Sequence, residues 1–273
     1  MAIRLRDEGI ALGDIPSAVD FDVPLVPADR PEKPPDFVSK DDPDYIQYKE
    51  DMQNYILAVR KHRKAVQKNM DLRSLRCSAA LKLNQAQKFK DFTEIYFPFN
   101  LDFRGRAYPI PPHLNHLGSD LSRGLLTFAH PKPLGKNGLY WLKVHLANLC
   151  GANKMSFDDR VKYSEDNLEN IRNSARDPFG GDMWWMSCEE PFQALATCKE
   201  IINAIDSGCP STYLCSLPVH MDGSCNGLQH YAALGRDTVG GRAVNLVSEK
   251  VPQDVYVGVM EEVSYVNMFE LLV

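Results

Sequence analysis

The chain has 273 residues, which suffice for one large domain or two small ones. Hydrophobic residues make up 44% and charged residues 25%, so a buried core is feasible and the composition argues against wholesale disorder. The formal net charge of −5 excludes a chain that is basic throughout, although it leaves room for a local basic stripe.

The cysteines argue against both a zinc site and a disulfide framework. Their number is odd and none forms a C-x-x-C pair: Cys77, Cys150, Cys188, Cys198, Cys209, Cys215 and Cys225. We therefore expect buried free thiols.

The sequence shows neither a membrane-spanning segment nor a targeting peptide. No run of residues is long and apolar enough to span a bilayer, so we expect no membrane partner. The first eight residues include acidic side chains and lack an apolar core, so they do not resemble a signal or transit peptide.

The first third of the chain changes character at about residue 45. Residues 11–44 are rich in Pro and Asp, and we expect an extended connector that lies on a surface. Residues 45–90 lack Pro and Gly and favour a long helix.

This predicted helix carries a dense group of cations that only Asp71 opposes. They include Arg60, Lys61, Arg63, Lys64 and Lys68. Two interpretations remain open: a solvated helix face, or a helix that follows a nucleic-acid backbone, where each neutralised phosphate releases counterions.

A short aromatic segment follows. Residues 95–99 are aromatic and β-branched and predict a strand, after which Gly105 and several prolines force turns. Arg104 and Arg106 flank the glycine, an arrangement that suits phosphate binding because guanidinium groups grip phosphate oxygens in pairs. The alternative is an ion pair of Asp102 with an arginine that only fixes the turn.

The middle of the chain predicts three helices. Leucines of residues 139–149 share one helical face, and Gly151 follows as a stop signal. Residues 158–175 predict a polar helix, and Pro191 suits the first turn of a third helix that ends at Gly208.

The last third predicts a strand over 212–221, irregular because of Pro218, and helices over 227–235 and 251–263. The strand delivers Asp222 and Gly223 into a turn that is rich in oxygen ligands and suits a hard cation such as Mg²⁺. The alternative is an Asx turn in which Asp222 caps the next helix.

Other chemistry is not indicated. The P-loop, G-x-G-x-x-G and G-x-S-x-G patterns are absent. Five histidines match no metal-site spacing and are interpreted as polar or packing residues: His113, His116, His145, His220 and His230.

Taken together, these segments resemble the single-subunit RNA polymerases of phage and mitochondria. The resemblance rests on residues 97–109, 112–120, 141–148, 184–185, 190–192 and 217–237. Their order and spacing fit over roughly residues 25–260, and residues 113–119 favour the mitochondrial branch.

The resemblance implies a predominantly helical α+β fold that forms part of a right-hand polymerase. The implied parts are a thumb-like helical segment with a Pro-rich connector (1–92), palm (93–130), helical palm insertion (131–212), palm motif A (213–238) and the start of the fingers with an atypical tail (239–273).

The resemblance also implies an activity and its residues. Asp222 would be a catalytic carboxylate that binds Mg²⁺ together with the backbone carbonyl of Gly223, in a site for two ions. Template and hybrid binding would fall to Arg104, Gly105 and Arg106, and nucleotide binding to Tyr108 and Lys154.

The implied partners are a DNA template, an RNA product, nucleoside triphosphates and mitochondrial transcription factors, and the implied location is the mitochondrion. A fingers helix and a second catalytic aspartate of the family lie beyond Val273, so we expect a fragment that does not polymerise by itself. Two rivals are a non-catalytic nucleic-acid-binding product and a metal-dependent phosphohydrolase.

Overall fold

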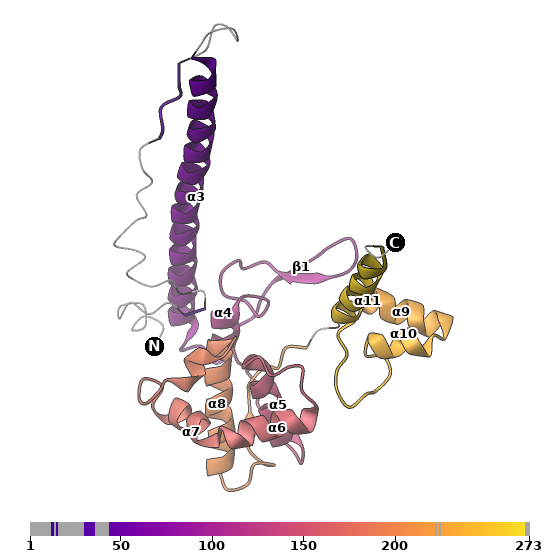
Figure 1. The fold of residues 1–273 in the computed structure, drawn as a ribbon. Coiled ribbons are helices and arrows are strands. Elements are labelled where there is room, and N and C mark those ends of the chain that lie inside the picture. The colour runs from indigo at the N-terminus through magenta and orange to yellow at the C-terminus, as the bar shows by residue number, and fades with distance from the viewer. Residues whose placement is uncertain are drawn as a thin grey trace. The chain divides into compact units, whose positions relative to one another are not determined.

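The computed structural model describes residues 12, 13, 15, 30–35, 44–221, 223 and 225–270. It divides into two compact units, Met1–Ser122 and Arg123–Val273. Figure 1 shows a mainly helical chain with a few short strands. The predicted helical α+β character is thereby confirmed.

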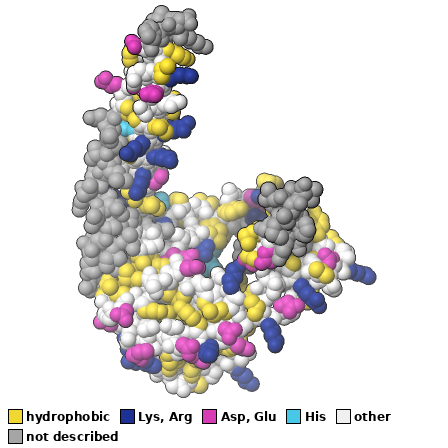
Figure 2. Space-filling view, in the orientation of Figure 1, with side chains coloured by type: hydrophobic (Ala, Val, Ile, Leu, Met, Phe, Trp, Pro, Cys, Tyr) yellow, Lys and Arg dark blue, Asp and Glu magenta, His cyan; other side chains and the backbone are white. Residues whose placement is uncertain are grey.

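The first unit is dominated by one long helix, α3 (Tyr45–Phe89), as the absence of Pro and Gly predicts (Figure 1). Its 45 residues make it about 68 Å long at about 1.5 Å per residue. Most of its side chains reach solvent, and Lys and Arg line its visible face in Figure 2. Its C-terminal half is anchored, because the buried Lys82 donates a hydrogen bond from Nζ to Ser119 Oγ at 2.7 Å.

A β-hairpin follows α3, built from β1 (Phe99–Leu101) and β2 (Ala107–Pro109) in antiparallel register. The strand predicted at 95–99 is therefore misplaced, since pairing begins only at Phe99. The partner strand is three residues long, so residues 95–98 have no strand to pair with.

The predicted surface connector is only partly described and partly wrong. Leu12 and Ile15 are buried, because their apolar side chains gain from leaving water. Their backbones exchange two hydrogen bonds at 2.9 Å. Residues 30–35 form no regular structure, in keeping with their prolines. The remainder of this stretch lies outside the described residues.

The second unit is built around packed helices that enclose the main core (Figure 1). Their bounds are α5 (Gly138–Leu149), α6 (Phe157–Asp166), α7 (Leu168–Arg176), the 3₁₀ turn η1 (Trp184–Ser187) and α8 (Pro191–Asp206). The short helix α4 (Asp120–Leu125) crosses the division between the units. The core includes Leu142, Leu146, Ile171, Ala194, Cys198 and Ile201.

The boundaries predicted for α8 hold, and the helix predicted before it needs a correction. Helix α8 begins at Pro191, and Gly208 lies just past its end with φ +75°. The single helix predicted over 158–175 is two helices, because Asn167 ends α6 and begins α7. Its side-chain amide donates to the carbonyl of Tyr163 at 2.9 Å, and such a local bond competes with continued helix.

The predicted strand over 212–221 is reduced to β4 (Leu214–Cys215), which pairs with β3 (Lys132–Pro133). Pro218 has no N–H to donate, so the ladder does not continue past it.

Three more helices follow: α9 (Asn226–Gly235), α10 (Thr238–Ala243) and α11 (Val255–Glu270). Helix α11 begins later than predicted because Asp254 caps it, accepting the Tyr256 N–H at 3.0 Å. Searched over the described part of the chain, no helix has the length and apolarity needed to cross a membrane.

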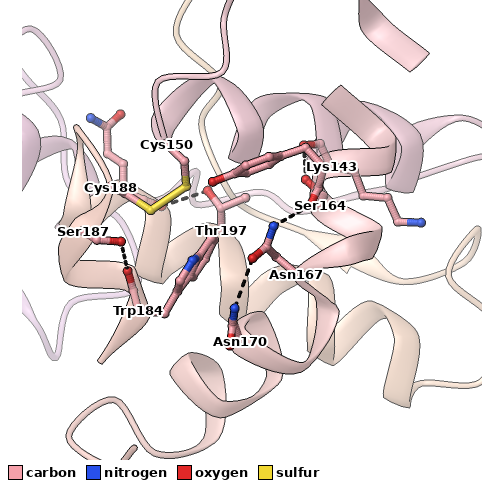
Figure 3. The surroundings of a disulfide bond; sticks show 11 residues. Lys143, Cys150, Ser164, Asn167, Asn170, Trp184, Ser187, Cys188 and Thr197 are labelled. Carbon is pink, nitrogen blue, oxygen red and sulfur yellow. Dashed lines mark hydrogen bonds between the residues drawn. A yellow bond between two sulfur atoms is a disulfide. The ribbon is translucent and has the colours of Figure 1, made fainter. Parts of the chain in front are cut away.

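The expectation of free thiols is wrong for two cysteines. Cys150, at the end of α5, and Cys188, before α8, form a disulfide (Figure 3). The adjoining backbone is paired as well, since the Glu190 N–H donates to the Leu149 carbonyl at 3.0 Å. Such a pairing arises from tertiary contact between segments 38 residues apart, which cysteine spacing does not reveal. Among the other cysteines, Cys198 is buried, whereas Cys77 and Cys209 are exposed.

We predict that Leu146→Ala lowers the free energy of unfolding by about 2–5 kcal/mol, because Leu146 is 0% exposed in the core and truncation leaves a cavity. Urea unfolding followed by circular dichroism measures the change. The matched control is Leu214→Ala, whose side chain is 57% exposed. An equal loss in both variants would contradict the assignment of the core.

Candidate nucleotide and nucleic-acid interface

The β1–β2 hairpin turn is fixed by Asp102. Its Oδ1 accepts the backbone N–H groups of Arg104 at 2.8 Å and Arg106 at 2.9 Å. The Gly105 N–H donates to the Asp102 carbonyl at 3.0 Å, and Gly105 has φ +79°, a conformation that favours glycine. The carboxylate therefore shapes the backbone of the turn.

The side chains of this turn point into solvent. Phe103 is 94% exposed, and the Arg104 guanidinium lies 5.2 Å from the centre of its ring. Arg104 Nε lies 3.7 Å from Asp102 Oδ2, but the arginine side chain is 60% exposed, so the pair is solvated and weak. Arg106 and Tyr108 are exposed on the same hairpin. Asp102 therefore fixes the turn, as the second interpretation predicts, and the arginines stay accessible, while phosphate binding remains a prediction.

The cations predicted on α3 share one side of that helix. Arg60, Lys61, Arg63, Lys64 and Lys68 are all exposed, and at about 100° per residue they fall within an arc of about 160°. Figure 2 shows dark blue Lys and Arg side chains along this helix. This arrangement can follow a polyanion, and it equally suits a solvated face.

Asp222 itself lies outside the described residues, so its neighbours define its surroundings. Gly223 is exposed, and a side chain at this position would collide with the side chain of Asn226. The N-cap of α9 is Cys225, in a left-handed conformation with φ 57°. Asp222 stands three residues before this cap in the sequence.

A complete metal site is not formed by the residues whose structure is described. Among them, no group of three or more His, Cys, Asp or Glu could hold an ion. A site for Mg²⁺ at Asp222 and the Gly223 carbonyl would need further ligands, in keeping with an ion that relies on few protein carboxylates.

Lys154 binds the N-terminus of α11. Its Nζ donates to Asp254 Oδ2 at 2.8 Å, although the lysine side chain is 70% exposed. This hydrogen bond is the main reason why the pKa of Asp254 is lowered. The sequence drew attention to Lys154 but not to Asp254, which is one of many acidic residues.

The same turn of α11 also contacts the segment after Asp222. A hydrogen bond with Cys225 is the first cause of the raised pKa of Tyr256. Asp254 and Tyr256 therefore connect Lys154 on one side to the Asp222 segment on the other. The structure thus brings together two segments that the sequence singles out separately.

The loop of Lys154 has a second support that the sequence did not indicate. Arg160 of α6 is buried and donates three hydrogen bonds, to Asn153 O at 2.8 Å, Asn148 Oδ1 at 3.0 Å and Met155 O at 2.9 Å. An arginine in a polar helix is ordinarily exposed, so no sequence signal marks this role.

Two of the predicted histidines take part in packing, whereas His230 is exposed. His116 lies against Phe97 and Phe99, with ring centres 5.8 and 5.4 Å apart. His145 is buried on α5, and burial, with a smaller contribution from His220, lowers its pKa to about 4. These positions agree with the interpretation of the histidines as packing residues.

Comparison with known proteins defines the class. The sequence pattern of the family described as DNA-dependent RNA polymerase matches residues 132–268, half of the chain. The chain therefore belongs to the DNA-dependent RNA polymerase family, of the single-subunit, phage-type class.

Similar proteins are organellar enzymes of plants. The chain is 54% identical over 197 residues to DNA-directed RNA polymerase 2, chloroplastic/mitochondrial, of Arabidopsis thaliana, covering 71% of this chain and 20% of that protein. It is 55% identical, with the same coverage, to DNA-directed RNA polymerase 1, mitochondrial, of Nicotiana sylvestris. It is 51% identical over 208 residues to DNA-directed RNA polymerase 3B, chloroplastic, of Nicotiana tabacum, covering 76% and 21%. The chain spans about one fifth of the length of these curated relatives.

We predict that Lys154→Met raises the pKa of Asp254 toward 3.8, its ordinary value, because the largest cause of the lowered pKa is removed. A carboxylate with a lowered pKa stabilises the fold above its unfolded pKa, and this contribution is lost as the pH falls through the folded pKa. The stability difference between the two proteins should therefore shrink in acid. Carbon-detected NMR titration of the carboxylate measures the shift, with the exposed Lys162→Met as control. An unchanged pKa in Lys154→Met would refute the ion pair.

Proposed function

We propose that this chain is a catalytic segment of a DNA-directed RNA polymerase that transfers nucleotides from nucleoside triphosphates to an RNA 3′-hydroxyl under the direction of a DNA template. The observation that carries this proposal is the first turn of α11, which connects Lys154 to the segment that follows Asp222. A cation for the triphosphate and a carboxylate at the reacting centre are the two charges that phosphoryl transfer requires close together.

In this proposal Asp222 and the Gly223 carbonyl hold Mg²⁺, with further ligands from outside the described residues. When bound, the ions of such a site stabilise the charge that develops on the attacking and leaving oxygens. Lys154 binds the triphosphate through its ammonium group and so holds the incoming nucleotide at the site.

The first unit would bind the nucleic acids. Exposed guanidinium groups at Arg104 and Arg106 suit phosphate oxygens, and Gly105 between them lets a backbone approach closely. Phe103 and Tyr108 offer ring faces for stacking with bases or sugars. The cations of α3 would neutralise additional phosphates along a duplex.

The same proposal assigns thumb, palm, palm insertion and fingers to the ranges implied by the resemblance. The curated relatives carry mitochondrial and chloroplastic names, so an organelle is the proposed location, with the mitochondrion as the first choice. Transcription factors of that organelle are the proposed protein partners.

One observation favours a second function, non-catalytic nucleic-acid binding. The exposed cations of α3 and of the hairpin need no metal to bind phosphate, and the described residues hold no cluster of metal ligands. The polymerase function requires Asp222 as a metal ligand, whereas non-catalytic binding does not.

We predict that Asp222→Asn, placed in a full-length polymerase that carries this segment, lowers RNA extension at least about a thousandfold, because a metal-binding carboxylate is lost. Binding of a primer–template should stay within about twofold, since the proposal assigns Asp222 to metal binding and assigns the duplex to other residues. Primer extension and fluorescence anisotropy measure the two quantities. An unchanged extension rate would refute the assignment of Asp222. Extension by the 273-residue chain alone would refute the expected need for further ligands.

We predict that Arg104→Gln and Arg106→Gln each weaken binding of a primer–template by the 273-residue chain and reduce the salt slope of log affinity by about one, as expected for one phosphate contact. Anisotropy titrations at several salt concentrations measure both effects. The control is Arg172→Gln, since Arg172 is engaged with Asp206 at 3.3 Å on another part of the chain. A salt slope that is unchanged in both hairpin variants would remove the hairpin from the interface.

A further inference from the structure

Arg160 is a buried cation whose three acceptors are neutral oxygen atoms. Its guanidinium donates to two backbone carbonyls and to the side-chain amide of Asn148. The ring of Phe157 lies over it, with Cζ 5.0 Å from the ring centre. Burying a charge in this way is costly, and among the residues that the structure describes no carboxylate forms an ion pair with Arg160 to offset that cost.

Helix α6 has its own cap and does not need Arg160 to begin. Ser156 is the N-cap, and its Oγ accepts the Asp159 N–H at 3.2 Å. The hydrogen bonds of Arg160 instead reach back into the loop before the helix. The hydrogen bonds of Arg160 therefore do not serve to cap the N–H groups in the first turn of α6.

The two backbone carbonyls that Arg160 binds belong to Asn153 and Met155, the residues on either side of Lys154. Fixing both peptide groups fixes the backbone from which the Lys154 side chain leaves. A lysine at position 160 would keep the charge but not the planar fork that reaches several acceptors at once.

We propose that Arg160 is a positioning residue for Lys154: it holds the 153–155 loop so that the Lys154 ammonium is presented to the triphosphate of an incoming nucleotide. The inference rests on the proposed function in one respect, the assignment of Lys154 to the triphosphate. Asp254 holds the same ammonium from the side of α11, and a polyphosphate replaces that carboxylate when it binds.

The test measures the accessibility of Lys154 in the full 273-residue chain. The amine is acetylated with an N-hydroxysuccinimide ester, and modification of Lys154 is quantified by mass spectrometry while inorganic tripolyphosphate is titrated. We expect tripolyphosphate to protect Lys154 in the wild type. Arg160→Lys should raise the half-protecting concentration at least about fivefold, since the charge remains but the loop is no longer fixed.

Two controls separate positioning from general effects. Arg172→Lys changes an arginine of α7 that is paired with Asp206, and it should leave the half-protecting concentration unchanged. Sulfate at matched ionic strength should protect far less than tripolyphosphate. Equal protection by sulfate would mean ionic screening only and would overturn the proposal.

A second variant keeps the test decisive if Arg160→Lys unfolds. Asn148→Ala removes one of the three acceptors and retains Arg160, and we expect a two- to threefold higher half-protecting concentration. Circular dichroism establishes that each variant is folded. The proposal is overturned if Lys154 is not protected in the wild type, or if folded variants need the same tripolyphosphate concentration as the wild type.

A readout in a full-length polymerase that carries this segment distinguishes this inference from the proposed function. Arg160→Lys should raise KM for the nucleotide about fivefold and leave kcat nearly unchanged, because binding is affected and the reacting groups are intact. An equal fall in kcat with KM unchanged would contradict positioning of Lys154. If Asp222→Asn leaves extension unchanged while tripolyphosphate still protects Lys154, the polymerase assignment fails and the role of Arg160 stands.

Discussion

The hydrogen bonds of the Asp254 carboxylate hold together the residues around Lys154 and the start of α11 in the second unit. Its Oδ1 accepts the Tyr256 N–H at 3.0 Å and so begins α11, while its Oδ2 binds Lys154 at 2.8 Å. One side chain therefore sets both the start of a helix and the place of a distant lysine. Because Tyr256 of the same turn contacts Cys225, the position of α11 also bears on the Asp222 segment. Arg160 also holds the Lys154 loop, donating to the Asn153 carbonyl at 2.8 Å.

In the β1–β2 hairpin, too, a single carboxylate fixes the backbone beside exposed cations. Asp102 directs one carboxylate oxygen to two backbone N–H groups, and the neighbouring arginines keep their guanidinium groups in solvent. In both places a carboxylate defines backbone geometry beside a cation whose side chain is mostly exposed, 60% for Arg104 and 70% for Lys154. A surface ion pair contributes little to stability, so these pairs are better understood as supports of local geometry.

The last helices expose large apolar side chains to solvent. Many are exposed on α9, α10 and α11: Leu228, Tyr231, Leu234, Val239, Tyr256, Val259 and Met260. A protein that works by itself rarely leaves so many in water. The matched part of this chain covers only 20% of such a relative, so the relative contains additional chain that would cover side chains of this kind. The exposure is thus in keeping with a segment that functions within a larger protein.

What the sequence could predict, and what it could not, follows from the range of the interactions involved. Helices α3 and α8 were predictable because Pro and Gly mark their limits, a signal confined to a few neighbouring residues. The strand predicted at 95–99 lies about four residues before β1, because the position of a strand is decided by a partner strand that local composition does not specify. The Cys150–Cys188 bond and the contacts of Asp254 join residues far apart in the chain, and no spacing pattern announces them.

Arg160 is the most instructive case. It lies in a stretch whose polar composition predicts an exposed helix, and the structure buries it to hold a loop that leads into that helix. Arg104 could be proposed from its own chemistry beside a glycine, and Lys154 only from the resemblance to a family. A residue that holds another in position, such as Arg160, is of a common type, and only its burial in the folded chain distinguishes it. A search for functional residues in this family should therefore begin from buried charges with neutral acceptors as well as from sequence motifs.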